Sequence, residues 1–224
     1  MPPKFLMGRK RGMTQVFLPD GRCVPVTVLD AGPCPVVQVK TQQTDGYSAL
    51  QIGFHPQRAS RLSKPVVGHF KKANVPTHHY LREVRLKQDP EQKVGEQLGV
   101  DVFQVGDIVD VIGTNKGHGF QGVVTVWNFK GKRQTHGNMN QRGPGSIGMH
   151  SEPARTLKGK RMATRWGNER ITVKIVEVVA IDPANNRMLL KGSVPGWRNG
   201  VLLVRAAKTP KPKPQKPKEE PKKK

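Results

Sequence analysis

Short runs rich in valine and isoleucine recur along the chain, each bounded by glycine, proline, asparagine or aspartate. Runs of this kind are typical of β-strands. The segment DPANN, residues 182–186, separates two of them and has the residue types of a tight hairpin turn. The pattern predicts strands over residues 24–30, 36–40, 49–54, 107–113, 123–129, 171–181, 188–191 and 201–205.

The spacing of these runs predicts how the strands pair. No helix long enough for a crossover connection is visible between most of them. Parallel pairing needs such crossovers, whereas antiparallel strands follow one another through tight turns. We therefore expect a mainly β protein built on a small closed barrel. Residues 55–99 have weak periodicity and scattered basic residues, and we expect an inserted α/β lobe there with a helix around 77–86.

One long segment has no apolar periodicity at either the helical or the strand spacing. Residues 127–162 read WNFKGKRQTHGNMNQRGPGSIGMHSEPARTLKGKRM and hold a single acid, Glu152. Such a segment cannot bury a core of its own. It is too long for an ordinary connector, so it is either disordered or shaped by a polyanion that lies against it.

Charge is unevenly distributed along the 224 residues. Lysine and arginine total 39 against 16 acids, which gives a formal net charge of +23. Residues 128–165 carry nine basic residues and one acid. The Lys/Pro-rich tail, 208–224, carries eight lysines and two glutamates. We expect this tail to be disordered. Residues 89–110 are acidic, and we expect them to face away from the partner. The excess indicates nucleic acid, because each basic side chain that contacts a phosphate releases condensed counterions.

Several other classes of protein are disfavoured. No apolar run approaches the roughly 18 residues of a membrane-spanning helix, and we expect neither a membrane partner nor a signal peptide. Cys23 and Cys34 match no zinc or redox spacing, so we expect two buried or half-buried thiols in a reducing cytoplasm. The seven histidines lack metal-ligand spacing. No cluster of carboxylates indicates catalysis, and Ser146 in PGSIG does not match the nucleophile elbow of hydrolases.

A glycine-rich motif, GHGFQG at residues 117–122, matches the pattern GxGxxG, and with Val124 it also fits the glycine-rich loop of protein kinases. A dinucleotide-binding fold needs a helix after the glycines, and here we expect a strand. A kinase needs HRD and DFG elements, and neither string occurs in the sequence. We expect a turn in which the glycines allow the backbone to approach RNA closely.

A second basic cluster, Arg9, Lys10 and Arg11, precedes a strand. Its glycine neighbours and the overall charge favour phosphate contact over a merely solvated face. His136 and His150 lie in the basic segment. An imidazole there can stack on a base or donate to a phosphate, or it can simply be solvated, and the sequence does not separate these alternatives.

Several motifs follow one another in an order that resembles a known family. MGRKRGMTQVF, GTNKGHGFQGVV, WNF, THGN, PGSIG, KGKRMA and GNERIT are similar to the bacterial members of the ribosomal protein L3 family, and the resemblance covers about residues 4–206. It implies a translation-protein-type β-barrel and an extension that enters large-subunit ribosomal RNA (rRNA) towards the peptidyl transferase centre. It also implies a protein that helps begin large-subunit assembly and performs no chemistry.

The resemblance also implies roles for individual residues of the extension, which would span 127–165. Phosphate contacts along its arms would come from Lys130, Lys132, Arg133, Arg142, Arg155, Lys158, Lys160 and Arg161. Its tip would comprise Gly145, Ser146, Ile147, Gly148, Met149, His150, Ser151 and Glu152. The other RNA-binding candidates are Arg9, Lys10, Arg11, Lys116, His118, Trp127, His136 and Arg165.

The chain departs from the family at four positions. Asn115 stands where serine or threonine is usual, and Val126 where arginine is usual. Ser151 occupies the place of a glutamine that is methylated in some bacterial members, so that modification is excluded. Trp166 follows the KGK element where the family has a different sequence, and its role is not readable from the sequence.

These inferences divide the chain into six segments. They are 1–54, the first part of the barrel with its basic N-terminus; 55–99, the inserted lobe; 100–126, the return to the barrel; 127–165, the extension; 166–207, the last barrel strands; and 208–224, the tail. We expect rRNA and neighbouring ribosomal proteins as partners in the cytoplasmic ribosome, with no cofactor, metal or small-molecule substrate. A nucleoid-type protein, indicated by the tail, and a nucleotide-dependent enzyme that uses residues 117–122 are the alternatives.

Overall fold

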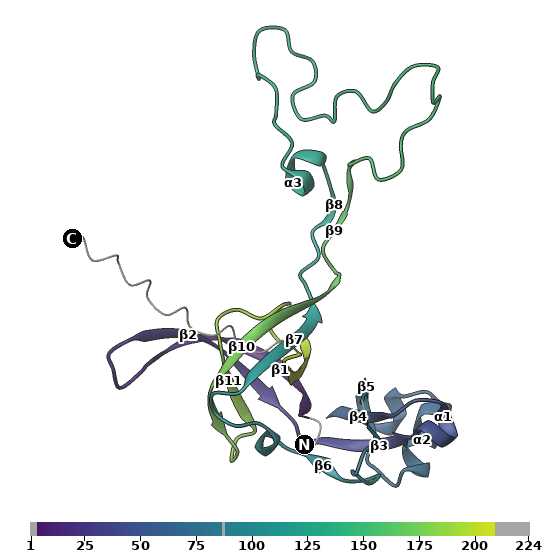
Figure 1. Cartoon of the computed structure of the whole chain (residues 1–224), viewed down its shortest axis with the longest axis vertical. Coiled ribbons are helices and arrows are strands. Elements are labelled where there is room, and N and C mark those ends of the chain that lie inside the picture. Colours follow the sequence, from purple (N-terminus) through teal and green to yellow (C-terminus); the bar gives the residue numbers. More distant parts are fainter. Residues whose placement is uncertain (1–3, 87, 209–224) are drawn as a thin grey trace, which may run out of the picture. The chain divides into compact units, whose positions relative to one another are not determined.

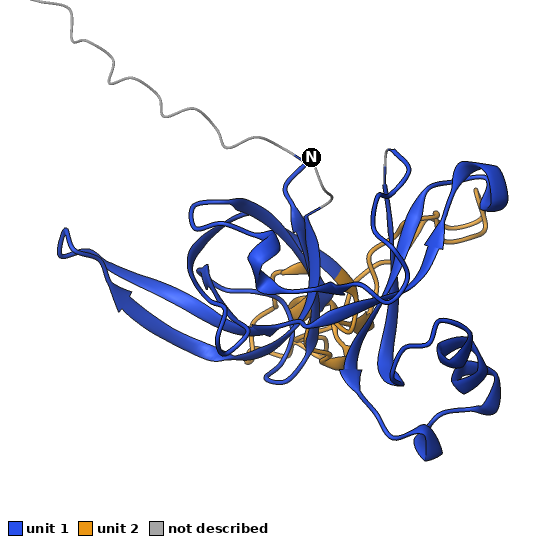
Figure 2. Ribbon diagram, turned by 90° about the horizontal axis from the view of Figure 1, so that it is seen from below, with its two compact units in different colours: residues 1–114, 171–224 blue, residues 115–170 orange. Residues whose placement is uncertain are grey.

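The computed structural model describes residues 4–86 and 88–208 (Figure 1). The chain divides into two compact units, coloured separately in Figure 2. The first comprises residues 1–114 and 171–224, and the second comprises residues 115–170. The acidic stretch at 89–110 falls in the first unit and the long basic segment falls in the second.

A closed six-stranded barrel forms the body of the first unit (Figure 1). The strands follow one another around the barrel in the order β1-β12-β7-β10-β11-β2. Adjacent strands pair antiparallel, as in β1 with β12 and β10 with β11, so the mainly β class and the closed barrel are confirmed. Their bounds are β1 Phe5–Phe17, β2 Cys23–Ala31, β7 Ile108–Thr114, β10 Arg170–Asp182, β11 Arg187–Lys191 and β12 Val201–Ala206.

The barrel closes around an apolar core, and alternate residues of its strands provide the buried side chains. In β11, Met188 and Leu190 are fully buried while Arg187 and Lys191 are exposed. Successive side chains of a strand point to opposite faces of the sheet, so one face of each strand reaches the core. The same core takes in Leu6 of β1 and is continuous with buried side chains of a second sheet. The turn between β10 and β11 is the DPANN segment, as predicted.

A second sheet of four strands, in the order β5-β4-β3-β6, completes the first unit. The runs at 36–40 and 49–54 are strands, as expected, but they pair in this sheet and not in the barrel. The alternation of a strand indicates that it has a buried face without indicating which partner covers that face. The strands are β3 Cys34–Lys40, β4 Ala49–Pro56, β5 His78–Arg85 and β6 Gln97–Leu98.

The prediction of a helix around 77–86 is wrong. That stretch is strand β5, which pairs antiparallel with β4 along seven residue pairs. The helix of this region is α2, Lys64–Lys72, which begins after Ser63 and buries Phe70. Pro65 stands in its first turn, where a missing N–H costs nothing. The remaining helical segments here are short: α1 Gln42–Asp45, η1 Ala59–Arg61 and η2 Val100–Val102.

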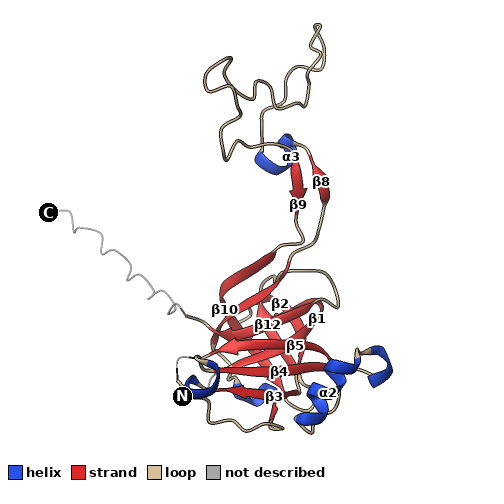
Figure 3. Cartoon of the chain, turned by 90° about the vertical axis from the view of Figure 1, so that its right-hand side faces the viewer, coloured by secondary structure: helices blue, strands red, loops and turns tan. Residues whose placement is uncertain are grey.

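The strand expected at 123–129 is also wrong. Residues Val123–Trp127 form a short helix, α3, which begins after Gly122 and ends where Asn128 adopts a left-handed backbone. Four of these five residues are apolar, and so short a run carries no periodicity that separates a helix from a strand. The other regular elements of the second unit are β8 Gly119–Gln121 and β9 Thr164–Trp166, which pair antiparallel. The rest of this unit is drawn as loop in Figure 3.

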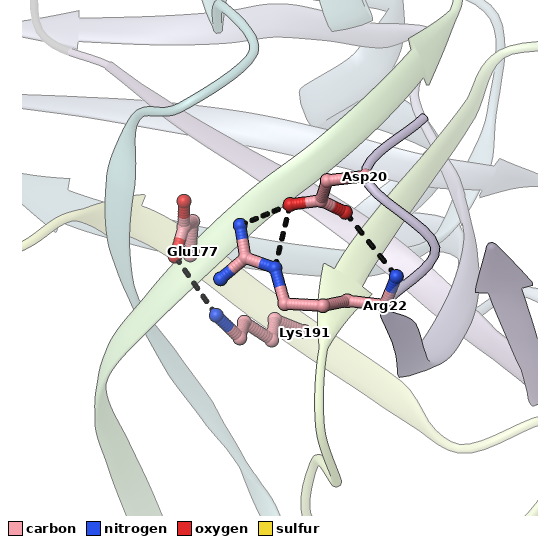
Figure 4. A network of polar contacts seen from close by, with 4 residues as sticks. All are labelled: Asp20, Arg22, Glu177 and Lys191. Carbon is pink, nitrogen blue, oxygen red and sulfur yellow. Dashed lines mark hydrogen bonds and ion pairs between the residues drawn. The ribbon is translucent and has the colours of Figure 1, made fainter. Parts of the chain in front are cut away.

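Ion pairs neutralise part of the charge of the first unit. Lys191 on β11 donates to Glu177 on β10 at 3.3 Å, and Arg22 donates to Asp20 at 2.6 Å in the turn between β1 and β2 (Figure 4). The Arg22 guanidinium lowers the pKa of the Asp20 carboxyl through this hydrogen bond. Acids of the acidic stretch are paired as well, because Lys4 contacts Asp107 at 2.7 Å.

Three other expectations concern the cysteines, membrane-spanning helices and the tail. Both thiols are free, and Cys34 is buried as expected. The expectation is wrong for Cys23, which is exposed. Within the described residues, no helix is both long and apolar enough to cross a membrane. The expected disorder of the tail concerns residues that, apart from Lys208, lie outside the described part of the chain.

Candidate nucleic-acid interface

A two-stranded ribbon forms the base of the second unit. The register of β8 and β9 places Gly119 opposite Trp166 and Phe120 opposite Arg165. Two backbone bonds continue the ribbon, from His118 N to Trp166 O at 2.8 Å and from Asn115 N to Glu169 O at 3.0 Å. The side chain of Asn115 adds a third, because its Oδ1 accepts from Glu169 N at 2.7 Å. Asn115, a departure from the family pattern, therefore closes the ribbon.

Aromatic rings lie along this base, and one of them, His118, is an RNA-binding candidate. The rings of His118 and Trp166 stack with centroids 4.2 Å apart and planes inclined by 22°. Phe120 on the same ribbon is 74% exposed. Exposed rings next to cationic side chains, here Arg165, are a usual platform for unpaired bases. The structure thus gives Trp166 a packing partner, which the sequence alone left open.

Trp127 connects the two arms of the extension. It ends α3, and its indole Nε1 donates to the carbonyl oxygen of Met162 on the returning arm at 2.8 Å. The guanidinium of Arg161 lies over the indole, 5.4 Å from the ring centroid. Cation–π contacts of this kind stabilise by about 0.5–1 kcal/mol where they are exposed. The start and the end of the extension are therefore joined at this point.

Between Asn128 and Ala163 the chain forms neither helix nor strand, and the hydrogen bonds that shape it are local. Lys132 N donates to Gln141 O at 3.0 Å, and the Gln141 side chain donates to Gln134 O at 3.0 Å. Asn138 Nδ2 donates to Arg133 O at 2.7 Å. These bonds fold the outgoing arm back on itself but leave many backbone groups available to an external partner.

The basic side chains of the extension share one property: all are exposed, and no ion pair joins any of them to a described acid. In the first unit, by contrast, ion pairs join described lysines and arginines to acids. Lys116, His118 and His136 are exposed as well. The exposed set comprises Lys130, Lys132, Arg133, Arg142, Arg155, Lys158, Lys160, Arg161 and Arg165.

The tip residues 145–152 are exposed throughout. Ser146 Oγ donates to Gly148 O at 3.1 Å, and His150 Nδ1 lies 3.4 Å from Ser151 Oγ. Met149 is 68% exposed, although it is apolar. The tip and the returning arm enclose a hollow of about 250 Å³ lined by Ile147, Met149, Pro153, Arg155, Leu157 and Lys160. Apolar side chains and cations thus meet at the tip.

The N-terminal basic cluster differs from the extension because its side chains have partners within the first unit. Arg9 Nε donates to Asn199 O at 3.2 Å. Lys10 Nζ donates to two carbonyl oxygens, of Val194 at 2.8 Å and of Gly196 at 3.2 Å. Arg11 forms an ion pair with Asp30. Arg9 and Lys10 therefore fix the loop before β12, whereas Arg11 pairs with β2. The sequence did not indicate these roles.

The structure revises the argument about residues 117–122. A short helix, α3, does follow the glycines, contrary to the strand that we expected. Residues 119–121 before it are strand β8, so the turn that we expected over this motif is wrong there. β8 pairs with β9 in an antiparallel ribbon and is not a strand of a parallel sheet. Dinucleotide-binding motifs place their glycines between a parallel strand and a long helix. The arrangement here is therefore different from a dinucleotide site.

Metal-binding side chains do not gather in the described part of the chain. No group of three or more histidine, cysteine or acidic side chains there could hold a metal ion.

Comparison with known proteins gives the family. The family model described as ribosomal protein L3 matches residues 87–186. The large ribosomal subunit protein uL3 of Syntrophotalea carbinolica is 48% identical over 206 residues, which cover 92% of this chain and 98% of that protein. The proteins of the same name from Thermotoga maritima and Geobacter sulfurreducens are 49% and 46% identical, each over 208 residues that cover 93% of this chain and 99% of the relative. This chain belongs to the ribosomal protein L3 family.

Proposed function

We propose that this chain is a structural, non-enzymatic constituent of the large ribosomal subunit. It aligns over nearly the whole length of relatives that are named large ribosomal subunit protein uL3. In this role it resides in the ribosome of the bacterial cytoplasm, next to other large-subunit proteins. It binds large-subunit rRNA directly through the extension, residues 127–165, and supports an early stage of subunit assembly.

The observation that carries this proposal is the set of exposed cations along the extension. No ion pair joins these cations to a described acid, so phosphates are the natural counterions. The arms also leave backbone donors and acceptors without regular secondary structure, and these groups bond to RNA or water. Arg142 and Lys160 are representative of the phosphate contacts that we propose on the two arms.

The same proposal extends to the tip. Residues 145–152 are the part of the extension that we place nearest the peptidyl transferase centre. Their exposed apolar and small side chains suit close approach to folded RNA, because they need no charged partner there. His136 and His150 are exposed on the same segment and supply rings that can stack on bases.

Exchange of the extension tests the function. In one variant, residues 130–161 are replaced by a glycine, serine and lysine linker of equal length and equal net charge. Large subunits assembled in cells that express it are washed in high salt and sedimented. We expect the unmodified chain to stay with the subunit and the linker variant to be lost. A non-specific binder of nucleic acid, the nucleoid-type alternative, would retain both chains equally or lose both.

A further inference from the structure

A cavity of about 240 Å³ lies in the first unit, outside the extension. Three parts of the fold supply its lining: the barrel strands β1 and β12 with the loop before β12, the end of β4 with η1, and the edge strand β5. The side chains that matter for its chemistry are those of Arg9, His55, Arg61, His79 and Tyr80. The volume is slightly below the roughly 300–1,000 Å³ of pockets for drug-sized ligands, so it suits a small group.

Positive charge and aromatic rings meet in this cavity. Arg9 and Arg61 bring two guanidinium groups, and none of the described residues that line the cavity is acidic. Arg9 is held in place, because its Nε donates to Asn199 O at 3.2 Å. Guanidinium groups bind phosphate oxygens through charge-assisted hydrogen bonds with defined geometry. The cavity therefore favours an anion.

Three rings form a corner beside these cations. The His55 and His79 rings lie 6.5 Å apart at 84°, and the His79 and Tyr80 rings lie 4.2 Å apart at 84°. Aromatic faces of this kind stack on nucleobases without regard to sequence. A site with guanidinium groups for a phosphate and ring faces for a base matches the two halves of a nucleotide.

His55 has two features that favour a binding role over a structural one. Its backbone is in the left-handed region, with φ of 63°, although it is not glycine. Such conformations cluster at binding sites. Burial, and after it the charge of Arg9, holds the pKa of His55 below its usual value. A neutral imidazole has one donor and one acceptor, and both can reach the edge of a base.

We propose that this cavity binds one nucleotide, with its phosphate on Arg9 and Arg61 and its base against the His55, His79 and Tyr80 rings. The inference rests on the proposed function in one respect, because a nucleotide unstacked from rRNA is the source that we favour. A free mononucleotide has the same chemistry and is the other source.

Two substitutions remove the binding groups with little risk to the fold. His55→Gly deletes a ring at a position where the left-handed backbone suits glycine. Arg61→Gln deletes a charge on an exposed side chain. Matched controls are Asn186→Gly, at φ of 50° and outside the cavity lining, and Arg58→Gln, an exposed arginine that does not line the cavity.

Ultraviolet crosslinking within assembled large subunits tests the RNA source. Peptides of the chain are searched by mass spectrometry for nucleotide adducts, and the peptide that contains His79 and Tyr80 is the same in all four variants. We expect an rRNA adduct there that falls at least about fivefold in the His55→Gly/Arg61→Gln double variant. The control variants should keep it. Titration of the purified full chain with adenosine monophosphate and with inorganic phosphate tests the other source.

The outcomes separate as follows. An rRNA adduct without millimolar binding of adenosine monophosphate supports the unstacked nucleotide. Binding of adenosine monophosphate that the double variant weakens at least about fivefold, with no adduct, supports the free nucleotide. If no adduct forms and neither probe binds, the proposal is overturned. If crosslinks to residues 127–165 persist in that case, the proposed function stands. If the chain fails to sediment with the subunit, the proposed function fails. The titration alone then decides whether the cavity binds a nucleotide.

Discussion

Gly167 closes the ribbon at the base of the extension, and its replacement by alanine is the most informative perturbation of the second unit. Its φ is +78°, and a Cβ atom there would lie 2.2 Å from Lys116 O and 2.9 Å from Gly117 Cα. Gly159 is the matched control, because its φ is +77° and a Cβ atom there would meet nothing within 4 Å. Gly167→Ala and Gly159→Ala therefore share the backbone strain and differ only in the clash.

The size of the effect follows from these contacts. A left-handed alanine costs about 1–2 kcal/mol at either position. Only at Gly167 must the opposite strand also move, and that strand carries the bonds from His118 N to Trp166 O and from Asn115 N to Glu169 O. Each bond contributes about 1 kcal/mol, so we expect the free energy of opening the ribbon to fall by roughly 3 kcal/mol in total. That corresponds to roughly a hundredfold faster amide exchange.

Hydrogen exchange measured by NMR on the purified chain gives the test. The amide of His118 should lose protection in Gly167→Ala and keep it in Gly159→Ala, where the strain is confined to the returning arm. Because the ribbon holds both ends of the extension, Gly167→Ala should also weaken binding to an rRNA fragment more than the control does. Equal exchange at His118 in the two variants would refute the steric reasoning.

Two further predictions concern the extension and the core. Arg142→Ala and Lys160→Ala should each lower the salt dependence of RNA binding by about one phosphate, whereas Lys191→Ala, which removes a paired cation, should not change the slope; unchanged slopes in all three variants would contradict the assignment. Burial raises the pKa of Cys34 to about 12, so a thiol reagent at pH 8 should modify Cys23 and spare Cys34 until the chain unfolds. The unfolded thiol loses its proton first, so the free energy of unfolding should fall above about pH 9, by at most about 1.4 kcal/mol per unit, and the Cys34→Ala variant should show a shallower decline.

Local information in the sequence determined the class of the fold and the nature of the extension. Period-2 alternation in runs such as 188–191 marks a strand with one buried face, whatever its partner is. The segment 127–165 lacks any apolar face and carries nine cations, and no packing of the chain against itself could change that composition. Both properties are read from neighbouring residues, which is why they needed no structure.

Only the tertiary structure decided pairing and contact. The strand at 36–40 joins the second sheet and the barrel closes without it, because alternation does not specify which strand lies alongside. Residues 123–127 are helical, since a glycine before them and a left-handed Asn128 after them leave room for one turn only. The partner of Arg9, Asn199, lies in the loop before β12, and the cavity that Arg9 lines draws on β1, β4, β5 and β12, which are far apart in sequence. Long-range packing brings these side chains together, and a single sequence carries no local signal of that packing.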